Sequence, residues 1–370
     1  MGEPRRSSAW PLALAFALLV VYASLYPFER WHLRDVTPWA YLWAPLPRYW
    51  TWFDVTANLL GYAPLGLLLT VAGLRAGAGR WAPWRAVGLA MGLSLLIETT
   101  QAFLPMRVAS NLDLALNTAG AALGAALARW LEHLGALARW SRFRSHWFVP
   151  QARGSLVLLA LWPPALLYPV SVPFGLGQVA ERVEATLAEW MQGTPFLQWL
   201  PTGDVVPAPL SSLTEAFCVA LGLLAPLLLG YADLRTAGRR ALFLLLLLVA
   251  GWLAVALSTA MTYGPSHAWS WVTPQALLGL GLALLAGLAL LGLPRRLCLV
   301  AMLLCLAVSL SLLNRSPASP YFSQALDVWE QGRFIRFHGL SQWLGWCWPF
   351  AALAFGLHSV ARRDRVQAAD

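Results

Sequence analysis

The chain has 370 residues, of which 59% are hydrophobic and only 12% are charged. A soluble domain carries about 25% charged residues, so this composition excludes an ordinary soluble protein and indicates an integral membrane protein. The net charge of +9 comes from arginines in short loops between apolar segments. That distribution is typical of membrane topology signals rather than of a DNA-binding face, so we expect no nucleic-acid partner.

Ten apolar segments of about 20 residues are long enough to cross a bilayer as helices. We therefore predict an all-α, polytopic integral membrane protein with about ten transmembrane helices. The first segment is interpreted as an uncleaved anchor, because no small-residue cleavage site precedes a soluble domain. The predicted spans are residues 10–28, 55–74, 86–104, 112–131, 154–173, 213–232, 241–260, 275–293, 297–313 and 341–360.

The loops between these spans predict the orientation. One alternate set of loops holds 18 of the 26 arginines, and it includes both ends of the chain. Because cytoplasmic loops carry the excess of basic residues, we expect both termini in the cytoplasm and a multi-pass protein of the bacterial inner (cytoplasmic) membrane.

The longest and most basic inner loop, residues 132–153, is the predicted domain boundary. It separates a four-helix membrane domain (1–131) from a six-helix membrane domain (154–370) whose role the sequence does not indicate. A four-plus-six division without a visible repeat argues against a duplicated transporter. Four cysteines lie inside predicted spans without metal-ligand spacing, so we expect no disulfide, metal or cofactor.

The predicted outer loops are longer and richer in aromatic residues. Residues 29–53 carry many Trp and Tyr side chains, which suit either the aromatic belt of a membrane interface or a surface that faces carbohydrate or lipid. Two short surface helices are expected, one over residues 181–190 and one within the stretch 321–336, where Gly332 ends the helix.

Polar residues gather in the stretch 97–120 and in the segment 54–58, next to apolar helices. An ionisable group in the hydrocarbon costs roughly 2.5–3.5 kcal/mol on insertion scales, so such a group usually pairs or has a function. Residues three or four apart share a helix face, which predicts that three polar pairs converge at one binding site. The candidate ligand-binding residues are Asp54, Asn58, Glu98, Gln101, Arg107, Asp113 and Asn117.

The helical rise places this predicted site in the outer third of the membrane, with Glu98 about 10 Å inward of Pro105. Arg107 lies in the turn between two helices and is the expected cationic partner of Glu98 or Asp113. Small-residue pairs, Gly88 with Gly92 and Gly120 with Gly124, predict close helix packing. Pro64 should kink the second helix next to Asn58.

Structural roles compete with a binding role at each polar position. Ser110 to Asp113 and Ser212 to Glu215 both match the capping-box pattern, and Asp54 suits a helix N-terminus. The two asparagines, Asn58 and Asn117, could simply hydrogen-bond between helices. Glu98 lies in mid-helix, where the competing role is a buried pair with Arg107.

Three motifs in this region resemble the VanZ-like family. They are Asn58-Leu-Leu-Gly-Tyr-Ala-Pro64-Leu-Gly66, then Glu98-Thr-Thr-Gln101-Ala-Phe-Leu-Pro105-Met-Arg107, then Ser110-x-x-Asp113-x-x-x-Asn117-Thr-Ala-Gly120. The resemblance covers about residues 10–131. The family is named for a protein associated with teicoplanin resistance, so the resemblance implies a cell-envelope membrane protein. It links the expected function to glycopeptide (antibiotic) resistance or to exopolysaccharide, with a lipid-linked glycan or a glycopeptide-related molecule as the ligand.

Three functions follow from this reading. The first is binding or remodelling of a polar headgroup at the outer leaflet, with arginine for phosphate and amides for sugar hydroxyls. The second is a membrane-embedded enzyme on a lipid-linked envelope intermediate, with Glu98 and Asp113 as candidate catalytic acid and base. The third is a transporter, for which the polar residues are too localised.

Overall fold

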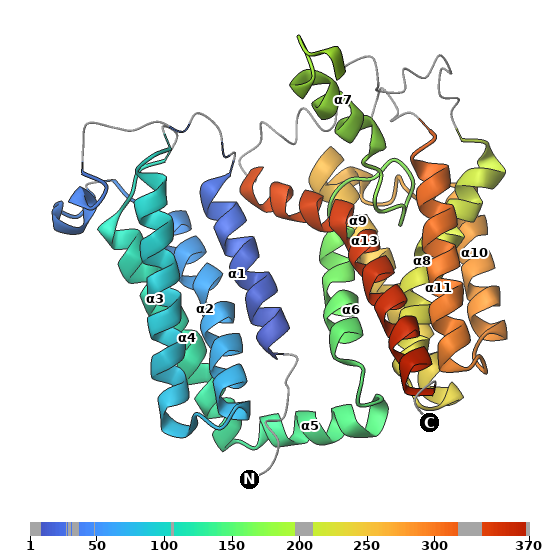
Figure 1. Cartoon of the computed structure of the whole chain (residues 1–370), viewed down its shortest axis with the longest axis horizontal. Helices are drawn as coiled ribbons and strands as arrows, with labels where there is room; N and C mark the ends of the chain where they lie inside the picture. Colours follow the sequence, from blue (N-terminus) through green and yellow to red (C-terminus); the bar gives the residue numbers. More distant parts are fainter. Residues whose placement is uncertain are drawn as a thin grey trace. The chain divides into compact units, whose positions relative to one another are not determined.

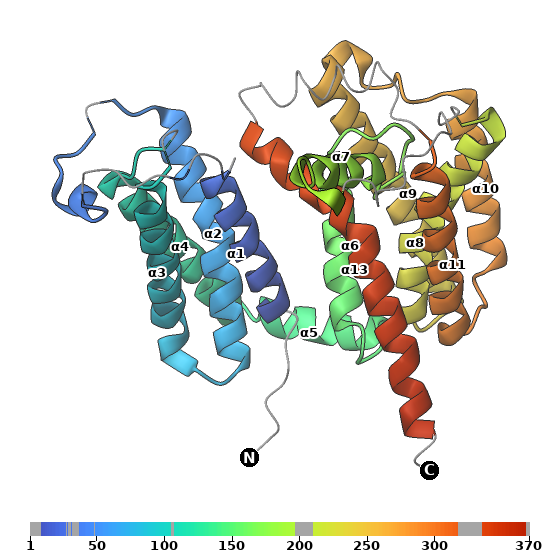
Figure 2. The same cartoon turned by 45° about the horizontal axis from the view of Figure 1, so that its top comes forward.

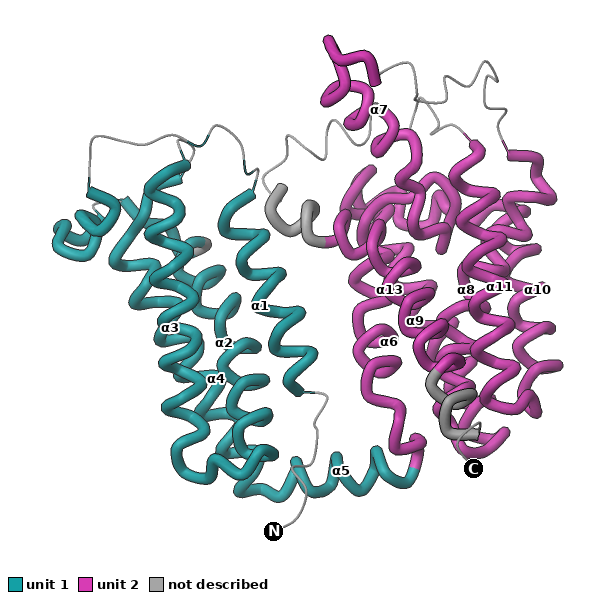
Figure 3. Tube along the Cα trace, in the orientation of Figure 1, with its two compact units in different colours: residues 1–146 teal, residues 147–370 magenta. Residues whose placement is uncertain are grey.

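The computed structural model describes residues 9–26, 28, 31, 37–47, 49–104, 107–196, 210–316 and 335–367. These residues form helices and connecting turns, and no strand is found among them apart from one isolated bridge between Phe148 and Leu234. Each of the ten predicted spans contains a helix, which confirms the all-α class. The chain divides into two compact units, unit 1 (residues 1–146) and unit 2 (residues 147–370), which are coloured separately in Figure 3.

Unit 1 is a bundle in which α1 to α4 lie side by side (Figures 1 and 2). The pair α2 and α4 makes the most extensive helix–helix contact of the described residues. A short 3-10 helix, η1, precedes α2, and another, η2, precedes α3. The bounds are α1 (Ala9–Leu25), η1 (Ala40–Trp43), α2 (Trp52–Arg75), η2 (Gly79–Trp81), α3 (Ala82–Gln101), α4 (Asn111–His133) and α5 (Ala136–Trp147).

Glycines bring the backbones of α2 and α4 together. A Cβ on Gly120 would overlap the carbonyl oxygen of Leu59, and a Cβ on Gly124 would overlap that of Ala63. The predicted close packing at Gly120 and Gly124 is therefore confirmed. The same prediction for Gly88 and Gly92 on α3 is wrong within this chain, because a Cβ on either would meet nothing within 4 Å.

Side-chain caps begin several of these helices. Thr51 and Asp54 form a complete capping box at the start of α2, and Ser110 accepts from the Asp113 N–H at the start of α4. The capping box predicted at Ser212 is wrong by one residue. The N-cap of α8 is Ser211, whose Oγ accepts from the N–H of Thr214.

Unit 2 surrounds α8 with the other long helices. The helix α8 is buried along almost its whole length, which makes it the centre of this unit. The bounds are α6 (Arg153–Ala165), α7 (Ala180–Trp190), α8 (Ser212–Asp233), α9 (Ala237–Tyr263), η4 (Pro265–His267), α10 (Pro274–Ala289), α11 (Arg295–Leu313) and α13 (Ile335–Gln367).

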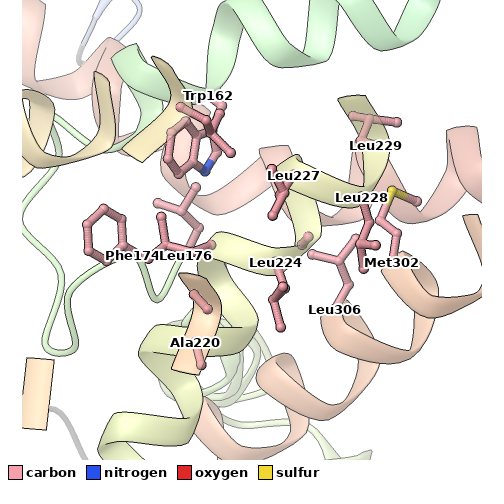
Figure 4. Packing of buried hydrophobic residues seen from close by; sticks show 14 of the residues in the cluster. Trp162, Phe174, Leu176, Ala220, Leu224, Leu227, Leu228, Leu229, Met302 and Leu306 are labelled. Carbon is pink, nitrogen blue, oxygen red and sulfur yellow. The ribbon is translucent and has the colours of Figure 1, made fainter. Parts of the chain in front are cut away.

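The predicted span 154–173 is wrong in its second half. The helix α6 carries Pro163 and Pro164 and ends at Ala165, so its 13 residues reach only about 20 Å at 1.5 Å per residue. The irregular segment that follows is buried. Figure 4 shows Phe174 next to Trp162, and the two rings stack with centroids 6.3 Å apart. Buried backbone without helical bonds needs other partners. Asn314 supplies one of them, because its Nδ2 donates to the carbonyl oxygen of Gly177 at 3.0 Å. Its Oδ1 accepts from the N–H groups of Val179 and Ala180 at the start of α7, both at 2.8 Å.

The predictions for the connecting segments can be compared with the structure in two places. The short helix predicted over residues 181–190 is confirmed as α7, whereas the one predicted over residues 321–336 lies largely outside the described residues. The basic loop expected over residues 132–153 is itself largely helical, because α5 occupies residues 136–147. The arginines of this segment lie on a helix rather than in an irregular linker.

Five helices are long and apolar enough to cross a membrane, and two apolar helices, α1 and α10, are shorter. The helices α3 and α4, with 20 and 23 residues, are long enough to cross a membrane but are not among these five apolar helices. A membrane protein is therefore supported, while the full number of spans and the orientation stay predictions. The five segments are Asp54–Arg75, Ser212–Asp233, Ala237–Tyr263, Arg295–Leu313 and Ser341–Ala361.

We expect Gly124→Ala to lower the free energy of unfolding by about 1–3 kcal/mol, because a backbone carbonyl cannot move aside for the new methyl group. The matched control is Gly88→Ala, which adds the same methyl group to α3 in open space and should be neutral or slightly stabilising. Thermal unfolding of both variants in detergent checks this. Equal melting temperatures for the two would contradict the close contact of α2 with α4.

Candidate functional site

The polar side chains of unit 1 meet where α2, α3 and α4 pack together. We use the name polar cluster for Asn58, Tyr62, Ser94, Glu98, Ser110, Asp113 and Asn117. One direct contact of the cluster joins two helices, because Nδ2 of Asn58 on α2 donates to Oδ1 of Asp113 on α4 at 2.8 Å. Both side chains are partly buried. The close approach of the two helix backbones makes so short a contact possible.

Glu98 joins α3 to the start of α4. Its side chain is 3% exposed, and Oε2 accepts from the backbone N–H of Ser110 at 2.9 Å. In a complete capping box the third helical residue, here Asp113, would accept from that N–H. The predicted capping box is therefore only half formed, since a carboxylate from another helix takes the second position. Asp113 is left to accept from Asn58.

Asn117 and Tyr62 lie deeper and keep unsatisfied polar atoms. Nδ2 of Asn117 donates to Oγ of Ser94 at 3.0 Å. Oδ1 of Asn117 is buried without a hydrogen-bond partner among the described residues, and the buried hydroxyl of Tyr62 faces the hydroxyl of Ser94 without a hydrogen bond of normal geometry. Each of the two side chains is 4% exposed. Rotating the amide of Asn117 would exchange its two atoms but still leave one of them unsatisfied. A buried polar atom without a partner costs about 1–3 kcal/mol, so these two groups need an explanation.

Gln101 and Arg107 hold the end of α1. Nε2 of Gln101 donates to the carbonyl oxygen of Ser24 at 2.9 Å, and Nη2 of Arg107 donates to that of Tyr26 at 2.7 Å. Both side chains are 9% exposed. These contacts satisfy carbonyls that the last turn of a helix leaves free. The contact shown for the Glu98 carboxylate is the Ser110 N–H, and its pairing with Arg107 stays a prediction.

Asp54 is placed apart from the polar cluster. Its Oδ2 accepts from the hydroxyl of Thr51 at 2.7 Å and from the backbone N–H of Thr51 at 3.2 Å. The side chain is exposed and completes the capping box of α2. Of the two roles that the sequence left open for Asp54, the structure favours the helix start.

The aromatic segment before α2 packs on the C-terminal end of α3 and the N-terminal end of α4. The Tyr41 hydroxyl lies 3.4 Å from Oγ1 of Thr99, and burial raises the pKa of this phenol, so it stays neutral. Nδ2 of Asn111 donates to the carbonyl oxygen of Ala44 at 2.6 Å. The neighbouring side chains of Trp43 and Tyr49 are exposed. An aromatic surface therefore borders the polar cluster.

Two members of the cluster were missed by the sequence analysis. Ser94 lies four residues before Glu98, and Tyr62 lies four residues after Asn58, so both share a helix face with a predicted residue. The spacing was available in the sequence. However, Ser and Tyr are common in membrane helices, and only the packing shows that one is a partner and the other is unsatisfied.

The chemistry available at the cluster is hydrogen bonding by amides, hydroxyls and two carboxylates. No group of three or more His, Cys, Asp or Glu side chains that could hold a metal ion occurs in the part of the chain that the structure describes. Exposure falls along the cluster, from the partly buried Asn58 and Asp113 to the buried Glu98 and Asn117. A polar group that enters past Asn58 and Asp113 would meet progressively less water.

Unit 1 is thus a four-helix module of a membrane protein, held by glycine contacts and furnished with a buried polar cluster. Residues 9–132, the N-terminal third of the chain, match the model of the VanZ/LLP1 family. The resemblance deduced from the three motifs is confirmed for this part of the chain, which contains all seven candidate residues. No curated protein and no solved structure matches the chain.

A double-mutant cycle tests the contact between α2 and α4. We expect Asn58→Ala and Asp113→Ala to show a coupling energy of about 1.5–3 kcal/mol, the range for a hydrogen bond to a charged group. The free energy of unfolding in mixed detergent micelles measures it. The control cycle pairs Asn58→Ala with Asp54→Ala, and these effects should add, because Asp54 bonds to Thr51 instead. Coupling in the control cycle alone would contradict the described arrangement.

Proposed function

We propose that unit 1 binds the polar headgroup of a lipid-linked envelope molecule, of the glycan type, at the outer leaflet. The observation that carries the proposal is the pair of buried, unsatisfied groups at the inner end of the polar cluster. Oδ1 of Asn117 accepts and the hydroxyl of Tyr62 can both accept and donate. A sugar hydroxyl offers the complementary donor and acceptor. Binding would remove the cost of leaving these atoms unpaired.

The surroundings of the cluster support the same ligand class. The partly buried Asn58 and Asp113 line the outer part, and the nearby aromatic surface suits the flat faces of sugar rings or the headgroup region of a membrane. Arg107 adds a positive charge near the outer end, which suits a phosphate in a lipid-linked intermediate. The match to the VanZ/LLP1 family supports an envelope role, with glycopeptide resistance and exopolysaccharide as the two settings.

A second candidate is an enzyme that acts on the same class of molecule. It rests on Glu98, a carboxylate that is 3% exposed and held by one backbone N–H beside the helix start that carries Asp113. Two carboxylates in unlike surroundings can serve as acid and base. Both candidates share one site, so the experiment must separate binding from turnover.

The test is lipid profiling of the purified full-length protein from a bacterial host. We expect envelope lipids with glycan headgroups to co-purify with the wild type, and Asn117→Leu to lower their amount about tenfold or more. The leucine keeps the volume but removes the hydrogen bonds, and a lost bond in a buried site costs on the order of one to three kcal/mol. Mass spectrometry of the extracted lipids measures the change.

Asp54→Asn is the matched control, since it alters a carboxylate at the helix start outside the cluster and should leave the lipid profile unchanged. Glu98→Gln separates the two candidates. Retained lipid together with accumulation of that lipid in the cells would favour turnover, whereas loss of lipid from a folded protein would favour binding. If folded Asn117→Leu and Glu98→Gln variants keep the wild-type profile and phenotype, the cluster is structural and both candidates fail.

A further inference from the structure

The helix α5 runs across the end of the unit 1 bundle instead of along it. Figures 1 and 2 show it crosswise to α1, α2, α3 and α4. Gly135 makes the sharp turn from α4, since its φ of 69° is a left-handed conformation that glycine adopts without strain. The polar cluster does not use this helix. The family match ends at residue 132, before α5 begins, so it assigns α5 nothing.

Leu137 anchors α5 at the level where a membrane span of unit 1 ends. Its side chain packs against a buried apolar cluster that includes Val71 and Ala72 on α2. The same cluster includes Ala128 on α4. The apolar span of α2 ends at Arg75, about one turn beyond the contact with Leu137. A helix that is held there, crosswise to a span, lies at the membrane interface.

The sequence of α5 gives the helix one aromatic face and one basic face. Residues three apart share a face, which groups Trp140 with Phe143 and, separately, Arg139 with Arg142. The rings of Trp140 and Phe143 stack with centroids 5.5 Å apart, and the two side chains are 50% and 41% exposed. Exposed aromatic rings beside arginines are typical of a helix that inserts one face below the lipid headgroups.

The two arginines carry positive charge that no described carboxylate neutralises. Both Arg139 and Arg142 are exposed. Arg139 donates to a backbone carbonyl, and the Arg142 side chain makes no hydrogen bond or ion pair among the described residues. The sequence has no Asp or Glu between Glu132 and Glu181. Glu132 itself pairs with Arg129. Two positive charges therefore remain beside the aromatic face.

We propose that α5 binds a surface of anionic phospholipids, with Trp140 and Phe143 below the headgroups and Arg139 and Arg142 at the phosphates. Both parts of such a lipid have a counterpart on this helix, because the aromatic rings suit the boundary of the acyl chains and the arginines suit the anionic headgroups. The partner is a lipid surface rather than an acidic protein, since α5 is anchored at the end of a membrane span, where headgroups surround it.

Quenching of a fluorophore on α5 tests the proposal in the full-length protein. Ala138 is exposed and lies outside the aromatic face, so an NBD group on Ala138→Cys reports lipid that is bound at α5. Cys347→Ala first removes the exposed native thiol. We expect phosphatidylglycerol with a nitroxide on its acyl chain to quench this label in mixed micelles at a lower mole fraction than the same derivative of phosphatidylcholine.

Three further substitutions in the labelled protein separate the two faces. Arg142→Gln should raise the half-quenching fraction of phosphatidylglycerol about fivefold, the effect expected of one basic residue near an anionic surface. Trp140→Ser should raise the fraction for both lipids, because it removes apolar area that each of them covers. The matched control is Arg315→Gln, which removes an exposed arginine from unit 2 and should change neither curve.

Two results would overturn the proposal. One is equal quenching by the two lipids in the labelled protein, or an unchanged phosphatidylglycerol curve for Arg142→Gln. The other is reversal of the quenching by inorganic phosphate at constant ionic strength, since the arginines would then recognise a free anion rather than a lipid surface.

Discussion

The contact between the backbones of α2 and α4 is the constraint on which unit 1 depends. Gly120 and Gly124 have no Cβ, so the carbonyls of Leu59 and Ala63 can lie directly against α4. Helices in a bilayer gain little from burying apolar surface, so they associate through close packing and hydrogen bonds. The same approach brings Asn58 within 2.8 Å of Asp113. A wider separation would leave both partly buried polar groups without this hydrogen bond, which is costly. Packing and polar pairing therefore stabilise one another.

The polar cluster shows how structural and functional needs share a few side chains. Glu98 completes the cap of α4 from a neighbouring helix, and this frees Asp113 to bond across to α2. These bonds account for most of the polar groups in the cluster. The unsatisfied Oδ1 of Asn117 and hydroxyl of Tyr62 are what a purely structural account does not explain. A cluster built only for stability would pair them or replace them with apolar groups, because satisfied or absent polar groups cost less.

Unit 2 places its buried polar groups differently from unit 1. Its centre is the buried helix α8, and an irregular segment after α6 packs into the same core around Phe174. Asn314 donates to the carbonyl oxygen of Gly177 in this segment, where the backbone has no helical bonds. The buried carboxylate of Asp233 lies at the end of α8, where it meets Ser155 and Arg295. The central helix of unit 2 is thus apolar along most of its length with its buried carboxylate at the end, whereas unit 1 carries Glu98 and Asn117 within the bundle.

Sequence alone sufficed to predict the all-helical class, the place of each long helix along the chain, the glycine contact on α4 and the match of the N-terminal third to the VanZ/LLP1 family. These follow from local properties: apolar length, helical spacing and residue type. The polar contacts between helices could be assigned only from the tertiary structure. It separated Asp54 from the cluster, added Ser94 and Tyr62, and gave Gly88 and Gly92 no partner in this chain. It also ended α6 at Ala165 and moved the cap of α8 to Ser211. Spacing shows which face a residue shares on its own helix, but its partner depends on the rotation and separation of the neighbouring helices, which the whole packing sets.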